Sequence, residues 1–182
     1  MVTLNQTLDM TPLGMIFHVT KTPAETNGHS LEMEWQLLPK ANGTPVHVHP
    51  TATETYQVLE GELELNINGA WTPAQQGNEI MVSAGTPHTF RNPTNDVVRV
   101  YNTHSPALQF GDYFEGLCAI VKKLSNEGTG KMTMNLNAAT RLSRLMKKYN
   151  QEMVSLNPPR LIISVLNTIR ENCGFTRILP TT

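Results

Sequence analysis

The sequence is poor in cysteine, and it has no long apolar run. Its two cysteines, Cys118 and Cys173, lie far apart and match no metal-ligand spacing, so we expect reduced thiols and no disulfide framework. No stretch approaches the roughly 20 apolar residues that a membrane-spanning helix needs. The N-terminus, MVTLNQTLDM, lacks the basic start and apolar run of a signal peptide. We therefore expect a cytoplasmic protein with no membrane partner.

Charge is also sparse and nearly balanced. Charged residues make up 16% of the chain, and the net charge is −1. Such a balance gives no general attraction to nucleic acid. The basic residues near the C-terminus are scattered and form no convincing recognition helix, so we expect no nucleic-acid partner. With 182 residues, the chain is long enough for one well-buried core but short for two independent domains.

Alternation of apolar and polar residues predicts a series of short β-strands. Leu31, Met33, Trp35 and Leu37 alternate with polar residues, and similar patterns follow at residues 54–58, 63–67, 78–82 and 97–103. Gly, Asn and Pro residues separate these stretches at intervals of about ten residues. This spacing favours an antiparallel sandwich or barrel.

The pattern changes to a helical one after Pro106. A first helix is expected over residues 112–124, with Asp112 as its cap and Glu115 three residues further on. A second apolar stripe covers residues 138–149, and a third helix is expected between Asn157 and Gly174. We expect these helices to pack on the barrel or on a second copy of the chain.

Three histidines and one glutamate have the spacing of a metal site. His47 and His49 are two residues apart, so on a strand both side chains point to the same face. Glu54 can approach from the next strand, and His88 follows a Gly-Thr-Pro turn further along. Burying four such groups without partners would cost several kcal/mol, and coordination of a metal would offset this cost.

These residues resemble the two sequence motifs of the cupin superfamily. The first motif, G-x5-H-x-H-x3,4-E-x6-G, is matched from His47 to Gly61, except that Ala41 stands at its opening glycine. The second motif is G-x5-P-x-G-x2-H-x3-N, and Ser83 replaces its proline. Its matching positions in this sequence are Gly77, Gly85, His88 and Asn92. Neither departure affects a ligand position.

The resemblance implies a mainly β fold, a double-stranded β-helix (jelly-roll) barrel with C-terminal α-helices. We expect residues 1–108 to form the barrel domain and residues 109–182 to form the helical extension. The run GTPHTFRNPT and the helical tail are similar to small cupins of the quercetin dioxygenase-like kind. The family also implies His47, His49, Glu54 and His88 as ligands of one divalent transition metal per chain. Iron and manganese rank first, and nickel, copper and zinc follow.

Three residues are candidates for a catalytic role, namely Glu54, Tyr56 and His104. Tyr56 shares a strand face with Glu54, whereas His104 either lines the pocket or lies at the surface. The leading hypothesis is a metal-dependent dioxygenase acting on a small enolic or aromatic, flavonol-like substrate. Two alternatives remain, a non-redox metal-dependent isomerase of a sugar or keto acid and a non-catalytic small-molecule-binding protein. We expect a homodimer.

Overall fold

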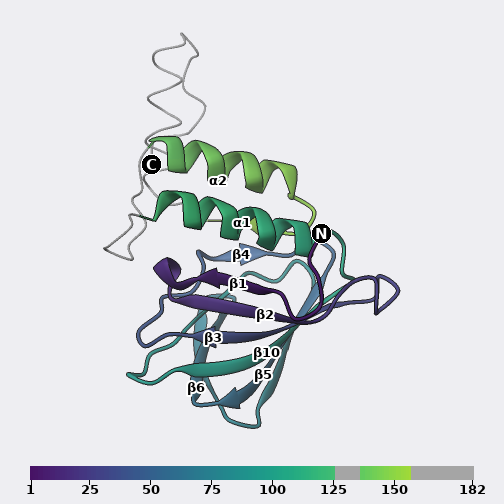
Figure 1. Cartoon of the computed structure of the whole chain (residues 1–182). Helices are drawn as coiled ribbons and strands as arrows, with labels where there is room; N and C mark the ends of the chain where they lie inside the picture. Colours follow the sequence, from purple (N-terminus) through teal and green to yellow (C-terminus); the bar gives the residue numbers. More distant parts are fainter. Residues whose placement is uncertain (126–135, 157–182) are drawn as a thin grey trace, which may run out of the picture.

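The computed structural model of the chain describes residues 1–125 and 136–156 (Figure 1). Eleven strands, one short 3-10 helix and two α-helices lie within these residues. In chain order the elements are β1 (Thr7–Met10), η1 (Thr11–Leu13), β2 (Met15–Lys21), β3 (Leu31–Leu37), β4 (His47–Val48), β5 (Thr53–Glu60), β6 (Glu62–Ile67), β7 (Ala70–Gln75), β8 (Glu79–Val82), β9 (His88–Arg91), β10 (Val98–Ser105), α1 (Phe110–Leu124), α2 (Leu136–Lys148) and β11 (Val154–Ser155).

The strands form two antiparallel sheets. The first sheet has the order β1-β2-β3-β10-β5-β8, and the second has the order β11-β4-β9-β6-β7. Alternate residues of the strands face a shared apolar core; on β3 these are Leu31, Met33, Trp35 and Leu37, all at most 3% exposed. This arrangement is a double-stranded β-helix and confirms the predicted fold class.

The two α-helices lie side by side at one side of the barrel, near β1 and β4 (Figure 1). On helix α1, the side chains of Phe110, Phe114 and Val121 are buried in the core. It begins at Phe110, so the prediction that Asp112 caps it is wrong. Asp112 and Glu115 instead lie 3.1 and 2.7 Å from the N-terminal amine, an ion pair that local sequence patterns do not reveal.

The loop that leads into β4 is fixed by two residues of the predicted motif region. Gly43 has a φ angle of +67°, and a Cβ atom at this position would lie 1.9 Å from the carbonyl oxygen of Phe90. The amide of Asn92 donates to the carbonyl oxygens of Leu37, Leu38 and Asp96. The loop is therefore packed against β9, the strand that carries His88.

Part of the expected C-terminal extension lies outside the described residues. The third predicted helix, between Asn157 and Gly174, falls entirely in this part. The division into a barrel domain of residues 1–108 and an extension of residues 109–182 therefore stays a prediction. Among the helices of the described residues, none has both the length and the apolar character needed to cross a membrane.

Candidate metal centre

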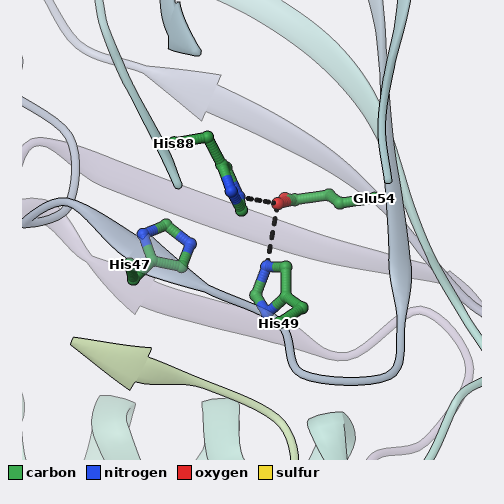
Figure 2. Close-up of side chains that lie close together, drawn as sticks. All are labelled: His47, His49, Glu54 and His88. Atoms are coloured by element: carbon green, nitrogen blue, oxygen red, sulfur yellow. Dashed lines mark hydrogen bonds and ion pairs between the residues drawn. The ribbon is translucent and has the colours of Figure 1, made fainter. Parts of the chain in front are cut away.

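The four predicted ligands come from both sheets and meet inside the barrel. His47 lies on β4, with His49 directly after it, and His88 is the first residue of β9. His47 and His88 are paired across these two strands. Glu54 reaches the same point from β5 in the other sheet (Figure 2). The histidines and the carboxylate thus face each other across the barrel interior.

The ligand atoms of these four residues are close enough to share one metal ion. All of them lie within 4.8 Å of one another, and each residue is at most 4% exposed. Nε2 of His49 and Nε2 of His88 lie 2.9 and 2.8 Å from Oε2 of Glu54 (Figure 2). The geometry brings together all four residues that the sequence predicted as ligands.

The hydrogen bonds of the three rings select the tautomer that a metal requires. Nδ1 of His47 lies 2.9 Å from the carbonyl oxygen of Pro45. Nδ1 of His49 lies 2.6 Å from the carbonyl oxygen of Glu152, and Nδ1 of His88 lies 2.8 Å from the carbonyl oxygen of Thr86. A carbonyl oxygen only accepts hydrogen bonds, so each Nδ1 carries a proton and each neutral ring keeps its lone pair on Nε2.

Positive charge between the rings and the carboxylate would stabilise this arrangement. In neutral His49 and His88, the Nε2 lone pairs would face the negative charge of Glu54, which is a repulsive contact. Either protons on these rings or a metal ion between them would remove the repulsion. A first-row metal accepts nitrogen and carboxylate ligands together, so the residues present fit such an ion.

The electrostatics of the cluster favour an ionised carboxylate at Glu54 and a neutral ring at His47. Burial alone would raise the pKa of Glu54, but the surrounding histidines, His104 first, hold it well below its usual range. Burial, and then the neighbouring rings, lower the pKa of His47 to about 3. Burial also acts to lower the pKa of His88, but the Glu54 carboxylate outweighs this effect and raises it.

The second oxygen of Glu54 is held by residues of β10. Oε1 accepts a hydrogen bond of 2.8 Å from Nδ2 of Asn102, and it lies 3.4 Å from Nε2 of His104. Both residues are fully buried or nearly so. Glu54 therefore directs one oxygen to the ligand histidines, while its other oxygen is fixed in the barrel wall.

His104 and Tyr56, the two other catalytic candidates, are both buried beside Glu54. His104 lines a cavity next to the cluster, so its alternative placement at the surface is wrong. Burial lowers the pKa of His104 to about 3. The Tyr56 hydroxyl and His104 Nδ1 have no hydrogen-bond partner within the described residues. Their catalytic roles remain predictions.

The cavity is small and mostly apolar. Its volume is about 30 Å³, and its wall includes Phe17, Trp35, Phe90, Phe110 and Met153. Pockets for drug-sized ligands measure about 300–1,000 Å³. A flavonol-sized molecule therefore requires movement of the wall, whereas a compound of a few atoms does not.

Sequence reasoning missed two contributors to the site, Asn102 and Glu152. The alternation along β10 placed Asn102 on one face with His104. It could not show that Asn102 contacts Glu54, because this contact depends on the register between β10 and β5. Glu152 contacts His49 through its main-chain oxygen, 103 residues further along the chain. Since any residue type has this oxygen, no sequence pattern could have marked the contact.

Comparison with known proteins agrees with the fold and the site. Residues 33–104 match the family described as Cupin domain, a stretch that contains all four candidate ligands. Residues 33–104 thus match a cupin domain, and the buried His/Glu cluster within them is a possible metal site.

Two curated relatives match parts of the chain. The HTH-type transcriptional regulator PuuR of Escherichia coli (strain K12) is 29% identical over 77 residues, which are 42% of this chain and 42% of PuuR. Quercetin 2,3-dioxygenase of Bacillus subtilis (strain 168) is 38% identical over 52 residues, which are 29% of this chain and 15% of that protein. The chain thus matches less than half the length of either relative.

A solved structure supports the fold alone. The RmlC-like cupin of Shewanella frigidimarina NCIMB 400 is 21% identical and has a TM-score of 0.51. The match covers 59% of this chain and 88% of that one. At this identity the likeness concerns the architecture and not the reaction.

Proposed function

We propose that this protein is a metal-dependent dioxygenase that binds one divalent transition metal per chain. Iron and manganese rank first, with nickel, copper and zinc as further candidates. One observation carries the metal binding: three rings donate from Nδ1 to carbonyl oxygens, and Nε2 of His49 and of His88 faces the carboxylate of Glu54. The match to a quercetin 2,3-dioxygenase supports the choice of reaction, although it covers only 15% of that protein.

The site favours a small substrate that carries an enol or an aromatic hydroxyl group. When bound, an iron or manganese ion would supply Lewis acidity and one-electron chemistry with O2. The largely apolar wall leaves about 30 Å³ beside the cluster, so a compact enolic molecule fits better than a flavonol.

His104 and Tyr56 are two buried side chains near Glu54 that could form hydrogen bonds with a substrate. His104 directs Nε2 to Glu54 and has an unpartnered Nδ1. Because burial keeps this ring neutral, we propose that Nδ1 accepts a hydrogen bond from the substrate hydroxyl and orients it. The pKa of Tyr56 is raised well above its usual value because burial disfavours the phenolate, so the hydroxyl stays protonated and can donate a hydrogen bond. The homodimer and the cytoplasmic location stay predictions of the sequence.

The test begins with metal content. We expect the wild-type chain, supplied with Fe(II) or Mn(II) without oxygen and then desalted, to retain close to one equivalent by elemental analysis. His47→Ala and Glu54→Gln should retain less than a tenth of this amount. His29→Ala is the matched control, because His29 is exposed and outside the cluster, and it should behave as wild type. Circular dichroism checks that each variant is folded.

Oxygen uptake by the loaded protein then tests the reaction. A catechol, an enediol and a flavonol are supplied in turn, and consumption of O2 with at least one of them is expected. A metal-loaded protein that consumes no O2 with any of them would contradict the dioxygenase proposal. Turnover without O2 and with zinc would indicate the isomerase instead.

A second candidate is a non-catalytic small-molecule-binding protein. The match to the transcriptional regulator PuuR favours it, since the match covers 42% of PuuR and 42% of this chain. This function predicts that a small ligand raises the melting temperature of the metal-loaded protein without being consumed. Calorimetry together with product analysis distinguishes the two candidates.

A further inference from the structure

The segment after α2 lies directly against the strand that carries the histidines. Strand β11 pairs with β4, so that Val154 is opposite Val48 and Ser155 is opposite His47. The amide of Leu156 continues this contact by donating to the carbonyl oxygen of Val46. In Figure 2 this yellow-green strand lies beside His47. Residues 149–156, called here the C-terminal strap, thus add a strand to the second sheet.

Glu152 joins the strap to two other elements. Its main-chain oxygen accepts a hydrogen bond of 2.6 Å from Nδ1 of His49. Its carboxylate accepts one of 3.1 Å from the backbone N–H of Gln109, the N-cap residue of α1. A negative charge is favourable at a helix N-terminus. Glu152 is 3% exposed, so both contacts are shielded from water.

His49 differs in this respect from the other two ligand histidines. His47 and His88 donate to the carbonyl oxygens of Pro45 and Thr86, each two residues earlier in the same loop. Their ring orientation is therefore a local property of the barrel. The ring of His49 is instead fixed by a residue 103 positions away. Of the three, only His49 has its Nδ1 partner on the C-terminal strap, whereas β11 contacts His47 through backbone pairing.

The strap also completes the cavity wall. Met153 lines the cavity, and its sulfur accepts a hydrogen bond of 3.4 Å from the hydroxyl of Tyr113 on α1. Glu152 and Met153 together connect the strap to α1 at two successive residues. The position of the Glu152 carbonyl group is thus set by packing on α1 as well as by β11.

We propose that Glu152 is a positioning residue for the metal centre. Its carboxylate anchors the strap on α1, and its carbonyl oxygen then holds His49 in the tautomer whose Nε2 faces Glu54. Metal affinity of the barrel is therefore set in part by the C-terminal extension. This inference rests on the proposed metal binding, but its effect on His49 exists without a metal as well.

The test compares variants of Glu152 in the full chain. Glu152→Ala removes the anchor, and we expect metal affinity, measured by competition with a chelator, to fall about 10-fold or more. In the metal-free protein, nitrogen-15 NMR of labelled histidines should show faster exchange of the His49 Nδ1 proton. The signal of His88 should not change, because its carbonyl partner is local and its strand does not pair with β11. The signal of His47 should change less than that of His49, because the Nδ1 partner of His47 is local although β11 pairs with its strand.

Two further variants act as controls. Gln151→Ala alters the exposed neighbour and should leave both readouts as in wild type. Glu152→Gln keeps an oxygen that can accept from Gln109, so affinity should return to within a few-fold of wild type. If Glu152→Ala does not fold, Glu152→Asp takes its place. The shorter aspartate side chain should not reach the backbone N–H of Gln109, so this variant should also lose metal affinity.

The outcomes separate this inference from the proposed function. If Glu152→Ala leaves both the His49 proton and the affinity unchanged, the positioning role is wrong. Equal changes at all three ligand histidines would also overturn it, since they would indicate general loosening of the barrel. If wild-type protein binds no metal, the proposed function fails, while a selective change at His49 in metal-free protein still supports the positioning role.

Discussion

At the scale of single residues, the hydroxyl of Tyr56 is buried at 0% exposure and has no hydrogen-bond partner within the described residues. A buried polar group without a partner costs about 1–3 kcal/mol. We therefore expect Tyr56→Phe to raise the free energy of unfolding of the metal-free protein by about 1 kcal/mol. For a chain of this size that corresponds to a melting temperature roughly 2–4 °C higher, measured by calorimetry.

Tyr101 provides the matched control for this prediction. Its hydroxyl donates to Glu32 at 2.6 Å and accepts from Thr20 at 3.2 Å. Tyr101→Phe should therefore destabilise the protein by about 1–2 kcal/mol. If Tyr56→Phe is instead as destabilising as Tyr101→Phe, the hydroxyl of Tyr56 has a partner in solution. A stabilised Tyr56→Phe that loses oxygen uptake would support the predicted catalytic role.

The candidate ligands could be predicted at this scale because their spacing is local. His47 and His49 share a strand face, and the interval to Glu54 fits one turn between two strands. Asn102 and Glu152 could not be predicted in the same way. Their contacts with Glu54 and His49 bridge 48 and 103 residues, respectively, and they depend on strand register and on a main-chain atom.

At the scale of elements, the loop before β4 depends on the absence of a side chain at Gly43. The φ angle of +67° and the distance of 1.9 Å that would separate a Cβ atom from the Phe90 oxygen both exclude a side chain. Left-handed backbone costs other residues about 1–2 kcal/mol, and overpacking costs about 1–3 kcal/mol. We expect Gly43→Ala to lower the free energy of unfolding by about 2–5 kcal/mol, measured by urea denaturation.

Gly69→Ala isolates the backbone contribution to this effect. Gly69 has a φ angle of +88°, but a Cβ atom at this position would have no neighbour within 4 Å, so only about 1–2 kcal/mol should be lost. Equal losses in the two variants would mean that the loop moves away from Phe90 without cost. In that case the loop would not fix the position of β4.

Most elements could be predicted because their side-chain periodicity spans several residues. The alternation at residues 31–37 became β3, and the helical stripe at residues 138–149 lies mostly on α2. Strand β11 could not be predicted, because its two residues are too few to show a period. The start of α1 was misplaced because the acidic residues Asp112 and Glu115 bind the chain's N-terminus.

At the scale of the whole molecule, metal loading should stabilise the fold. A metal ion that binds only the folded chain adds about 2.7 kcal/mol when its concentration is 100 times its dissociation constant. We expect the melting temperature to rise by roughly 5–10 °C with Mn(II), and a chelator should reverse this rise. A melting temperature that is the same with and without the ion would show that the cluster does not hold it.

The C-terminal strap covers an edge of β4 that could otherwise pair with another copy of this chain. Without β11, strand β4 would be the outermost strand of its sheet, and its free N–H and C=O groups could pair with a strand of another molecule. With β11 in place, these groups of β4 are paired within the chain, and β11 is the outer strand of this sheet among the described residues. The segment that contacts His49 therefore also covers an edge of the strand that carries His47.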